Sequence, residues 1–275
     1  MSKLLRAWTL DPLVVACIGV ALWWYLRALG RLRARPWPKW RTRCFVAGLA
    51  VIALALLSPV DVYAGYLLSV HMVQHLMLTM MAPPLLLFGA PMILTLLSAR
   101  ASNRDFLVRL LRGRTVRIFS KPLLGWSLFV ATLWATHLPV FYDATLRNLP
   151  LHVAEHMAYL TTALMFWRPI IGADPGPGRL SYPGRLLFLF LSMPQMAFLG
   201  LAIYMSDRVL YRAYVVPSAM HGTTALADQH LAGALMWASG MLFMVPAMAV
   251  VLMDWLRAED RDGARIDARL DRAAR

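Results

Sequence analysis

Long apolar segments follow one another along most of this chain, and short stretches rich in arginine separate them. A helix that spans a lipid bilayer needs about 20 mostly apolar residues. Seven segments meet this requirement, at about residues 13–29, 44–60, 66–97, 123–141, 151–171, 185–204 and 229–256. The pattern predicts an all-α polytopic membrane helix bundle of about seven transmembrane helices, in one domain that covers residues 1–275.

The third segment, residues 66–97, is longer than the others and contains Pro83 and Pro84. Proline lacks the backbone N–H that an α-helix uses, and its ring clashes with the preceding turn. At a rise of about 1.5 Å per residue, the segment is long enough for one tilted span. We therefore expect a single helix that is kinked at Pro83–Pro84 rather than two short helices.

The composition agrees with a membrane environment. Hydrophobic residues make up 60% of the chain and charged residues only 15%, whereas a soluble domain has about 45–50% and about 25%. The net charge of +14 would suggest nucleic acid as a partner of a soluble protein. Here the basic residues lie between apolar segments, so we expect contact with the lipid bilayer and no nucleic-acid partner.

Basic residues alternate between the two sides of the predicted bundle. Twenty-three of the 28 lysines and arginines fall in the first, third and fifth connections and in the tail 257–275. Because an excess of positive residues marks cytoplasmic loops, this predicts an outer N-terminus, a cytoplasmic C-terminus and a basic cytoplasmic tail. Cys17 and Cys44 lie at different depths in this topology, so no disulfide is expected.

Histidines gather on the outer side of the predicted topology, and two pairs share the pattern His-x-x-Gln/Glu-His. Residues four apart lie on one face of a helix, and polar residues inside a membrane span usually face the bundle interior and mark a functional site. Imidazole binds copper, zinc, iron and nickel. We therefore predict a metal site whose ligands are His71, His75, His152, His156 and His230.

Other polar residues accompany the histidines. Gln74 and Glu155 lie on the same helix stripes as the pairs, and Asp228 lies two residues before His230, so we predict that these three orient the imidazoles by hydrogen bonds. Additional candidates for the site are His137, His221, Met72 and Asp61. Thioethers suit Cu(I), although methionine also packs without binding anything; the candidates are Met72, Met80, Met81, Met157, Met193, Met196, Met205 and Met220.

Three motifs in this order resemble the CtaG-type assembly factors of caa3-type cytochrome c oxidase. They are His71-Met-Val-Gln-His75 with Met81-Ala-Pro-Pro84 and Gly89-Ala-Pro91, His152-x-x-Glu155-His156 with Phe166-Trp167-Arg168-Pro169, and Asp228-Gln229-His230-Leu-Ala-Gly233 with Met236-Trp237; Ser58-Pro59 and Asp61 also fit. The likeness covers roughly residues 13–256. It implies a non-enzymatic role in maturing a haem–copper oxidase of a bacterial plasma membrane, with copper bound and the oxidase catalytic subunit as partner.

Two other functions stay open on the residues alone. Histidines on facing helices also serve as axial ligands of haem, which would make the chain a membrane electron-transfer protein. The stretch His152-x-x-Glu155-His156 matches the inverzincin metalloprotease pattern, in which an intramembrane site would need Glu155 as general base. The only other glutamate is Glu259, on the predicted cytoplasmic side, so the third metal ligand would have to be Asp228 or another histidine.

Overall fold

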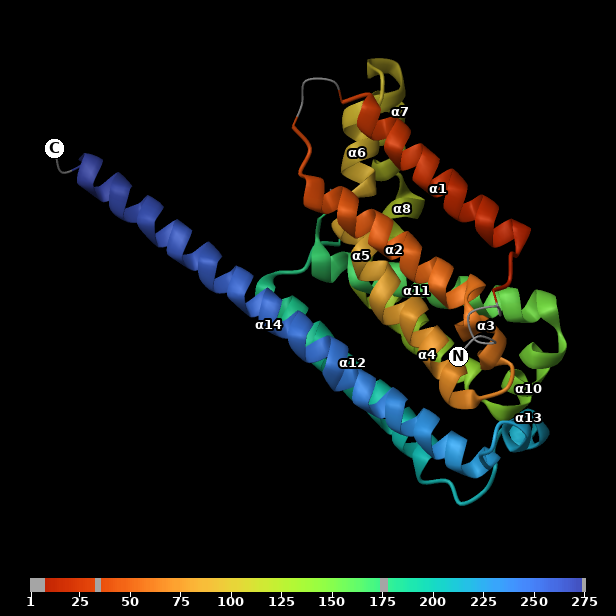
Figure 1. Cartoon of the computed structure of the whole chain (residues 1–275). Helices are drawn as coiled ribbons and strands as arrows, with labels where there is room; N and C mark the ends of the chain where they lie inside the picture. Colours follow the sequence, from red (N-terminus) through yellow and green to blue (C-terminus); the bar gives the residue numbers. More distant parts are fainter. Residues whose placement is uncertain (1–7, 33–35, 174–177, 274–275) are drawn as a thin grey trace.

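The computed structural model describes residues 8–32, 36–173 and 178–273, and every regular element within them is a helix. In chain order these are α1 Pro12–Gly30, α2 Lys39–Leu57, α3 Pro59–Ala64, α4 Leu68–Leu76, the π-helical turn η2 Met77–Met81, α5 Ala82–Phe88, α6 Pro91–Ser98, α7 Ala101–Arg112, α8 Arg114–Phe119, α9 Pro122–Thr136, α10 Pro139–Arg147, α11 Leu149–Ile171, α12 Tyr182–Tyr204, the 3₁₀ turn η3 Arg212–Tyr214, α13 Val215–Met220 and α14 Ala225–Ala273. The long helices lie side by side in one bundle (Figure 1). The predicted all-α membrane bundle is thereby confirmed.

Among the described residues, five helical runs are long and apolar enough to cross a membrane, and a sixth is present if α9 and α10 form one bent span. The remaining predicted segment, the fifth at 151–171, corresponds to α11, which is 23 residues long. It carries His152, Glu155 and His156, so its composition alone does not mark it as a span, yet Glu155 and His156 are buried against other helices. The count of seven and the orientation in the membrane stay predictions.

Two predicted segments have different ends in the structure. The second was expected at 44–60, but α2 runs from Lys39 to Leu57, because Ser58 adopts an extended backbone and its hydroxyl caps the next helix, α3, at Val60. The fourth was expected at 123–141, but α9 ends at Thr136. Leu138 is extended before Pro139, as residues before proline tend to be, and the chain turns by 79° into α10.

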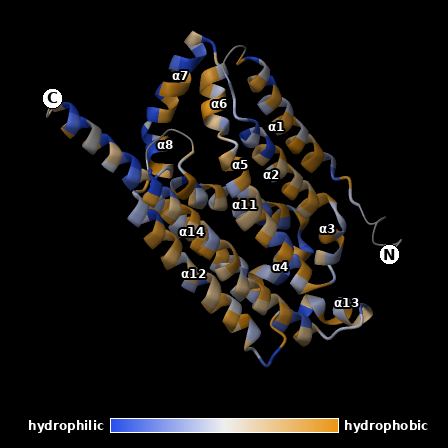
Figure 2. Ribbon diagram, turned by 60° about the vertical axis from the view of Figure 1, so that its left-hand side comes forward, coloured by the Kyte–Doolittle hydropathy of each residue, from blue (hydrophilic) through white to orange (hydrophobic). Residues whose placement is uncertain are grey.

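Regions expected as loops or tail are also helical. The arginine-rich third connection forms α7 and α8, and the basic tail 257–275 continues α14 to Ala273. Figure 1 shows this end of α14 projecting from the bundle, and Figure 2 shows that it is hydrophilic, like much of α7. Arg33 and Arg35 of the first basic connection, residues 174–177 of the fifth and the tail's last two residues lie outside the described residues.

The third segment is one 31-residue run, Leu68–Ser98, and its irregularity at the prolines takes the form of the π-helical turn η2. Thr79 lies in this turn, and the residues four and five further along are Pro83 and Pro84. Neither proline has an N–H to donate to the carbonyl of Thr79. The indole Nε1–H of Trp167 on α11 donates to that carbonyl instead, at 2.9 Å. The proline pair therefore depends on a side chain from another helix.

Trp167→Phe should lower the free energy of unfolding by about 1–3 kcal/mol, because it leaves the buried carbonyl of Thr79 without a donor. Denaturant titration of the purified protein in detergent micelles measures this loss. The matched control is Trp134→Phe, since the Trp134 indole donates to Gln195 from an exposed position. An equal loss in both variants would contradict the assigned role of Trp167.

Helices α12 and α14 run side by side (Figures 1 and 2), and two glycines bring their backbones into contact. A Cβ added at Gly200 would lie 2.6 Å from the backbone nitrogen of Trp237, and one added at Gly233 would lie 2.6 Å from that of Tyr204. Small residues allow such close packing between membrane helices. The start of α14 is therefore held firmly beside the end of α12.

Candidate metal centre

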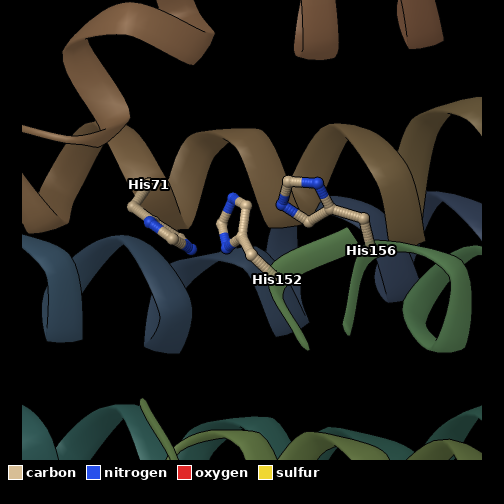
Figure 3. Close-up of side chains that lie close together, drawn as sticks. All are labelled: His71, His152 and His156. Carbon is tan, nitrogen blue, oxygen red and sulfur yellow. The ribbon is translucent and has the colours of Figure 1, made fainter. Parts of the chain in front are cut away.

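Helix α4 and the start of α11 bring four histidines together at one end of the bundle. His71 and His75 lie on one face of α4, and His152 and His156 lie on one face of α11. Figure 3 shows the rings of His71, His152 and His156 converging from the two helices. His71, His75 and His156 are buried, and His152 is partly buried. The structure thus places the two predicted pairs opposite each other.

The distances within this cluster suit shared coordination of one ion. The Nε2 atoms of His71 and His75 are 2.9 Å apart, and the ring centroids of His152 and His156 are 4.2 Å apart. Two sets of three residues have ligand atoms that all lie within 4.8 Å of one another: His71 with His152 and His156, and His71 with His75 and Glu155. We name these five residues the histidine centre.

Polar atoms without partners are concentrated in the histidine centre. Glu155 is only 2% exposed, and neither of its carboxylate oxygens has a hydrogen-bond partner among the described residues. The same is true of His75 Nδ1, His152 Nδ1 and His156 Nε2, although His152 Nδ1 lies 3.6 Å from Glu155 Oε2. Buried polar groups normally have partners, and an unpaired buried carboxylate is costly. This donor set fits a metal cation.

Glu155 lies close to imidazoles of both pairs. We predicted that it orients an imidazole, and its Oε2 lies 3.6 Å from His152 Nδ1. A carboxylate oxygen also lies within 4.8 Å of ring nitrogens of His71 and His75, so the residue can serve as a ligand as well. The ring nitrogens of His71 and His75 on α4, together with those of His152 and His156 and the Glu155 carboxylate on α11, form a set of donors that first-row transition metals accept.

Hydrogen bonds around His71 determine which of its nitrogens faces the centre. The Tyr214 hydroxyl donates to the carbonyl of Ala64 at 2.9 Å. It therefore accepts from His71 Nδ1, which is 3.0 Å away. A neutral His71 with its proton on Nδ1 presents a lone pair on Nε2 to the centre, which is the form that binds a metal.

Asp228 holds the helix that carries His71 and His75, rather than an imidazole. Its carboxylate accepts from the backbone N–H groups of Leu68 and Ser69, at 2.6 and 3.4 Å, and from the Ser69 hydroxyl. The first N–H groups of a helix lack partners within it, and a negative charge there is favourable. The residue before α4, Leu67, offers no side-chain cap. Asp228 on α14 therefore caps α4 from a distance.

Gln74 and Asp61 connect α4 to its other neighbours. The Gln74 amide donates to the carbonyl of Ala55, at 2.8 Å, and to Asp61 Oδ1, at 2.9 Å. Burial raises the pKa of the Asp61 carboxyl, and hydrogen bonds from Gln74 and Thr9 oppose that rise. These bonds fix the rotation of α4 about its axis, so Gln74 positions the histidines through the helix and not through a described bond to a ring.

Three predicted candidates lie apart from the histidine centre. His137 lies next to Met72, beyond His75. His221 is exposed between Tyr63 and Tyr66. His230 bonds to the carbonyl of Ser206 at 3.2 Å and packs on Tyr204. The structure does not bring His230 into either set of ligand atoms.

Comparison with known proteins places the chain among proteins of one family. The sequence profile of the cytochrome c oxidase caa3 assembly factor family matches residues 23–258. The chain belongs to this family. The resemblance drawn from the three motifs is thereby confirmed, and the family's description is an assembly role rather than a reaction.

Relatives of this family member occur in mycobacteria. An uncharacterized protein of Mycobacterium bovis is 31% identical over 284 residues, and one of Mycobacterium leprae is 28% identical over 282 residues. Each comparison covers 98% of this chain and 42% of the relative, so the chain spans about two fifths of the length of the curated relatives it matches. No solved structure matches the chain.

Tyrosines around the centre were not predicted from the sequence. The Tyr214 hydroxyl forms a hydrogen bond with His71. The ring centroid of Tyr142 lies 5.2 Å from that of His71, and the ring centroid of Tyr159 lies 4.4 Å from that of His75. All three are buried. Tyr142 lies in the short helix α10 and Tyr214 in the turn η3, and only Tyr159, three residues after His156, follows a helical spacing that could have revealed it.

Proposed function

We propose that this assembly factor binds a copper ion at the histidine centre and supplies it to a haem–copper oxidase during assembly. The observation that carries the proposal is the buried carboxylate of Glu155, which has no hydrogen-bond partner among the described residues and lies among imidazole nitrogens. A cation at this point offsets the cost of the buried charge. Imidazole with one carboxylate suits copper, and the family's role in assembling an oxidase favours copper over zinc or iron.

The chain's own residues hold the ion from two helices. His71, His75, His152, His156 and Glu155 donate lone pairs from two separate helices. Five donors exceed the four that a compact site needs, so one can leave as an acceptor protein offers its own ligand. Copper here is cargo, and the residues capture it, exclude most water and give it up by exchange.

The partner that fits this chemistry is the catalytic subunit of the oxidase, and the compartment is the outer face of a bacterial plasma membrane. The family description supports an oxidase partner. The basic connections and tail, on the opposite end from the histidines in sequence-based topology, support an outward-facing centre.

Haem and protease chemistry fit these residues less well. The four rings of the centre already lie within 4.2–6.4 Å of their neighbours, so a porphyrin would have to separate α11 from the third segment, against which it packs. In the proposed site Glu155 is itself a ligand of the ion, whereas a protease needs its glutamate free to act as a base on the metal-bound water.

The double variant His71→Ala/His152→Ala should lose nearly all Cu(II) binding, because it removes one ligand from each helix. Elemental analysis and electron paramagnetic resonance of the purified protein, loaded with Cu(II) alone, measure the loss, and the wild type should show nitrogen coupling. His221→Ala, an exposed histidine that bonds only within its own short helix in the described structure, is the control. Equal copper in all three proteins would overturn the proposed site.

A further inference from the structure

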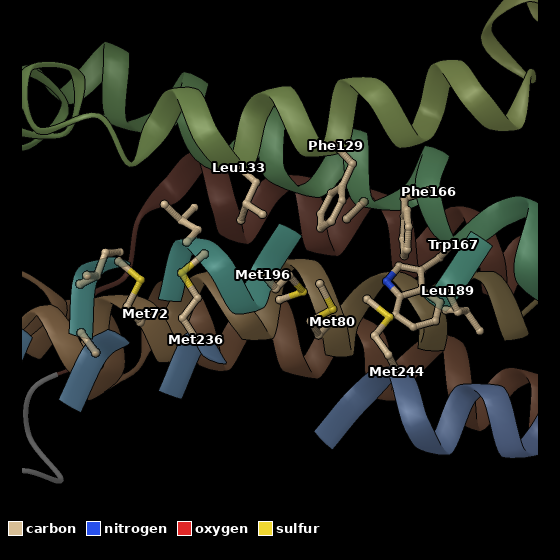
Figure 4. Close-up of a cluster of buried hydrophobic side chains, with 14 of the residues drawn as sticks. Met72, Met80, Phe129, Leu133, Phe166, Trp167, Leu189, Met196, Met236 and Met244 are labelled. Atoms are coloured by element: carbon tan, nitrogen blue, oxygen red, sulfur yellow. The ribbon is translucent and has the colours of Figure 1, made fainter. Parts of the chain in front are cut away.

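A second group of metal-binding atoms lies deeper in the bundle, beyond His75. A cavity of about 20 Å³ lies there, and the side chains that line it include Met72, Met80, Met196, Met236, His75 and His137. The four methionines are buried. Figure 4 shows their sulfurs along one line between the surrounding helices. A cavity of this size holds about one water or one bare ion.

The ring of His137 is fixed by a bond that determines where its lone pair points. Its Nδ1 lies 2.7 Å from the carbonyl of Leu133, which can only accept, so Nδ1 carries the proton. The imidazole is buried, and no carboxylate bonds to it in the described part of the chain. In the neutral ring the bare Nε2 then faces the Met72 sulfur at 3.5 Å. Thioether sulfur has lone pairs and no proton.

His137 Nε2 and Met72 Sδ thus face each other with lone pairs and with no hydrogen between them. A metal cation that accepts both lone pairs would make this buried contact favourable. Metal–nitrogen and metal–sulfur bonds to first-row ions are about 2.0 and 2.3 Å. At a tetrahedral angle these lengths separate nitrogen and sulfur by about 3.5 Å, which is the distance between His137 Nε2 and Met72 Sδ. The pair therefore has the spacing of two ligands of one ion.

We propose that this chain has a second, thioether-rich site for Cu(I), in which His137 Nε2 and Met72 Sδ are ligands and Met196 and Met236 complete the shell. Soft sulfur ligands select Cu(I) and are poor ligands for Zn(II). The identity of the metal rests on the proposed function, whereas the place of the site rests on the cavity and on the His137–Met72 pair.

His75 connects the two sites. Its ring centroid lies 5.6 Å from that of His156 and 6.4 Å from that of His137. It belongs to the histidine centre and also lines the methionine cavity, and its Nδ1 has no partner among the described residues. A copper ion in the monovalent state can therefore pass from nitrogen and oxygen ligands to sulfur ligands by way of one shared residue.

X-ray absorption of the full chain loaded anaerobically with Cu(I) alone tests the second site. The protein carries Cys17→Ser and Cys44→Ser, so that any sulfur bound to copper is a thioether. We expect a sulfur shell at about 2.3 Å, and Met72→Leu should remove this shell and halve the Cu(I) bound per chain. Met244→Leu, an equally buried methionine outside the cavity, should keep both.

The outcomes separate this site from the proposed function. A protein without a sulfur shell, or a Met72→Leu variant that keeps it, overturns the second site and leaves the histidine centre untouched. Zn(II) binding at the histidine centre in Met72→Leu serves as the check that this variant is folded. His71→Ala/His152→Ala should keep the sulfur shell while it loses Cu(II) binding; if it loses the sulfur shell as well, the second site does not exist as a separate one.

Discussion

Glu155→Gln should weaken metal binding by at least about a hundredfold and at the same time stabilise the metal-free protein. Loss of a residue that merely supports a ligand already costs about 10–100-fold in affinity, and a Glu155 oxygen lies within 4.8 Å of ring nitrogens of both His71 and His75. In the absence of metal its carboxylate is buried among groups that offer it no hydrogen bond in the described structure.

The gain in stability should be about 1–3 kcal/mol, the usual cost of a buried polar group without a partner. The amide of glutamine has nearly the same shape and carries no charge. Its N–H groups can donate to His75 Nδ1 or His152 Nδ1, which have no other partner among the described residues. Denaturant titration of metal-free protein in micelles measures stability, and competition with a copper chelator measures affinity.

Opposite signs for the two quantities distinguish a binding residue from a structural one. Glu259→Gln is the matched control, because Glu259 lies on the exposed part of α14 and bonds to Trp255. This control should change neither quantity. If Glu155→Gln destabilises the metal-free protein, the carboxylate serves the fold and is not held ready for a cation.

Gly233→Ala should lower the free energy of unfolding by about 3 kcal/mol and weaken the metal site as well. The added Cβ would lie 2.6 Å from the backbone nitrogen of Tyr204 and 2.7 Å from the carbonyl oxygen of Gly200. Neither neighbour is a flexible side chain, so α14 has to move away from α12. Overpacking of this kind costs about 1–3 kcal/mol, and sometimes more.

The effect should reach the histidines through Asp228. This residue lies five positions before Gly233 on the same helix and caps α4 at Leu68 and Ser69. Gly240→Ala is the control, because a Cβ there meets its nearest neighbours at 3.7 and 3.9 Å, which is ordinary contact. Thermal unfolding in detergent and Cu(II) titration measure both variants. Equal behaviour of the two would show that the Gly200–Gly233 contact does not control the position of α14.

Several features of the fold follow from local sequence. Each predicted span is largely helical because about 20 apolar residues in a row leave little else that satisfies the backbone in lipid. The ends were less predictable, since they depend on single residues such as Ser58, which caps α3, and Pro139, which starts α10 after a turn of 79°. Helix α11 was found by its length despite its polar residues.

The sequence by itself determined that His71 lies beside His75 and His152 beside His156, because four residues make about one helical turn. Only the tertiary structure decided that the two pairs meet, that Glu155 joins them, that His230 does not, and that Asp228 caps α4 instead of orienting an imidazole. Spacing along one helix is a local property of the backbone. Which faces of two helices meet, some 80 residues apart in the chain, depends on close contacts such as Gly200 with Gly233 and Trp167 with Thr79.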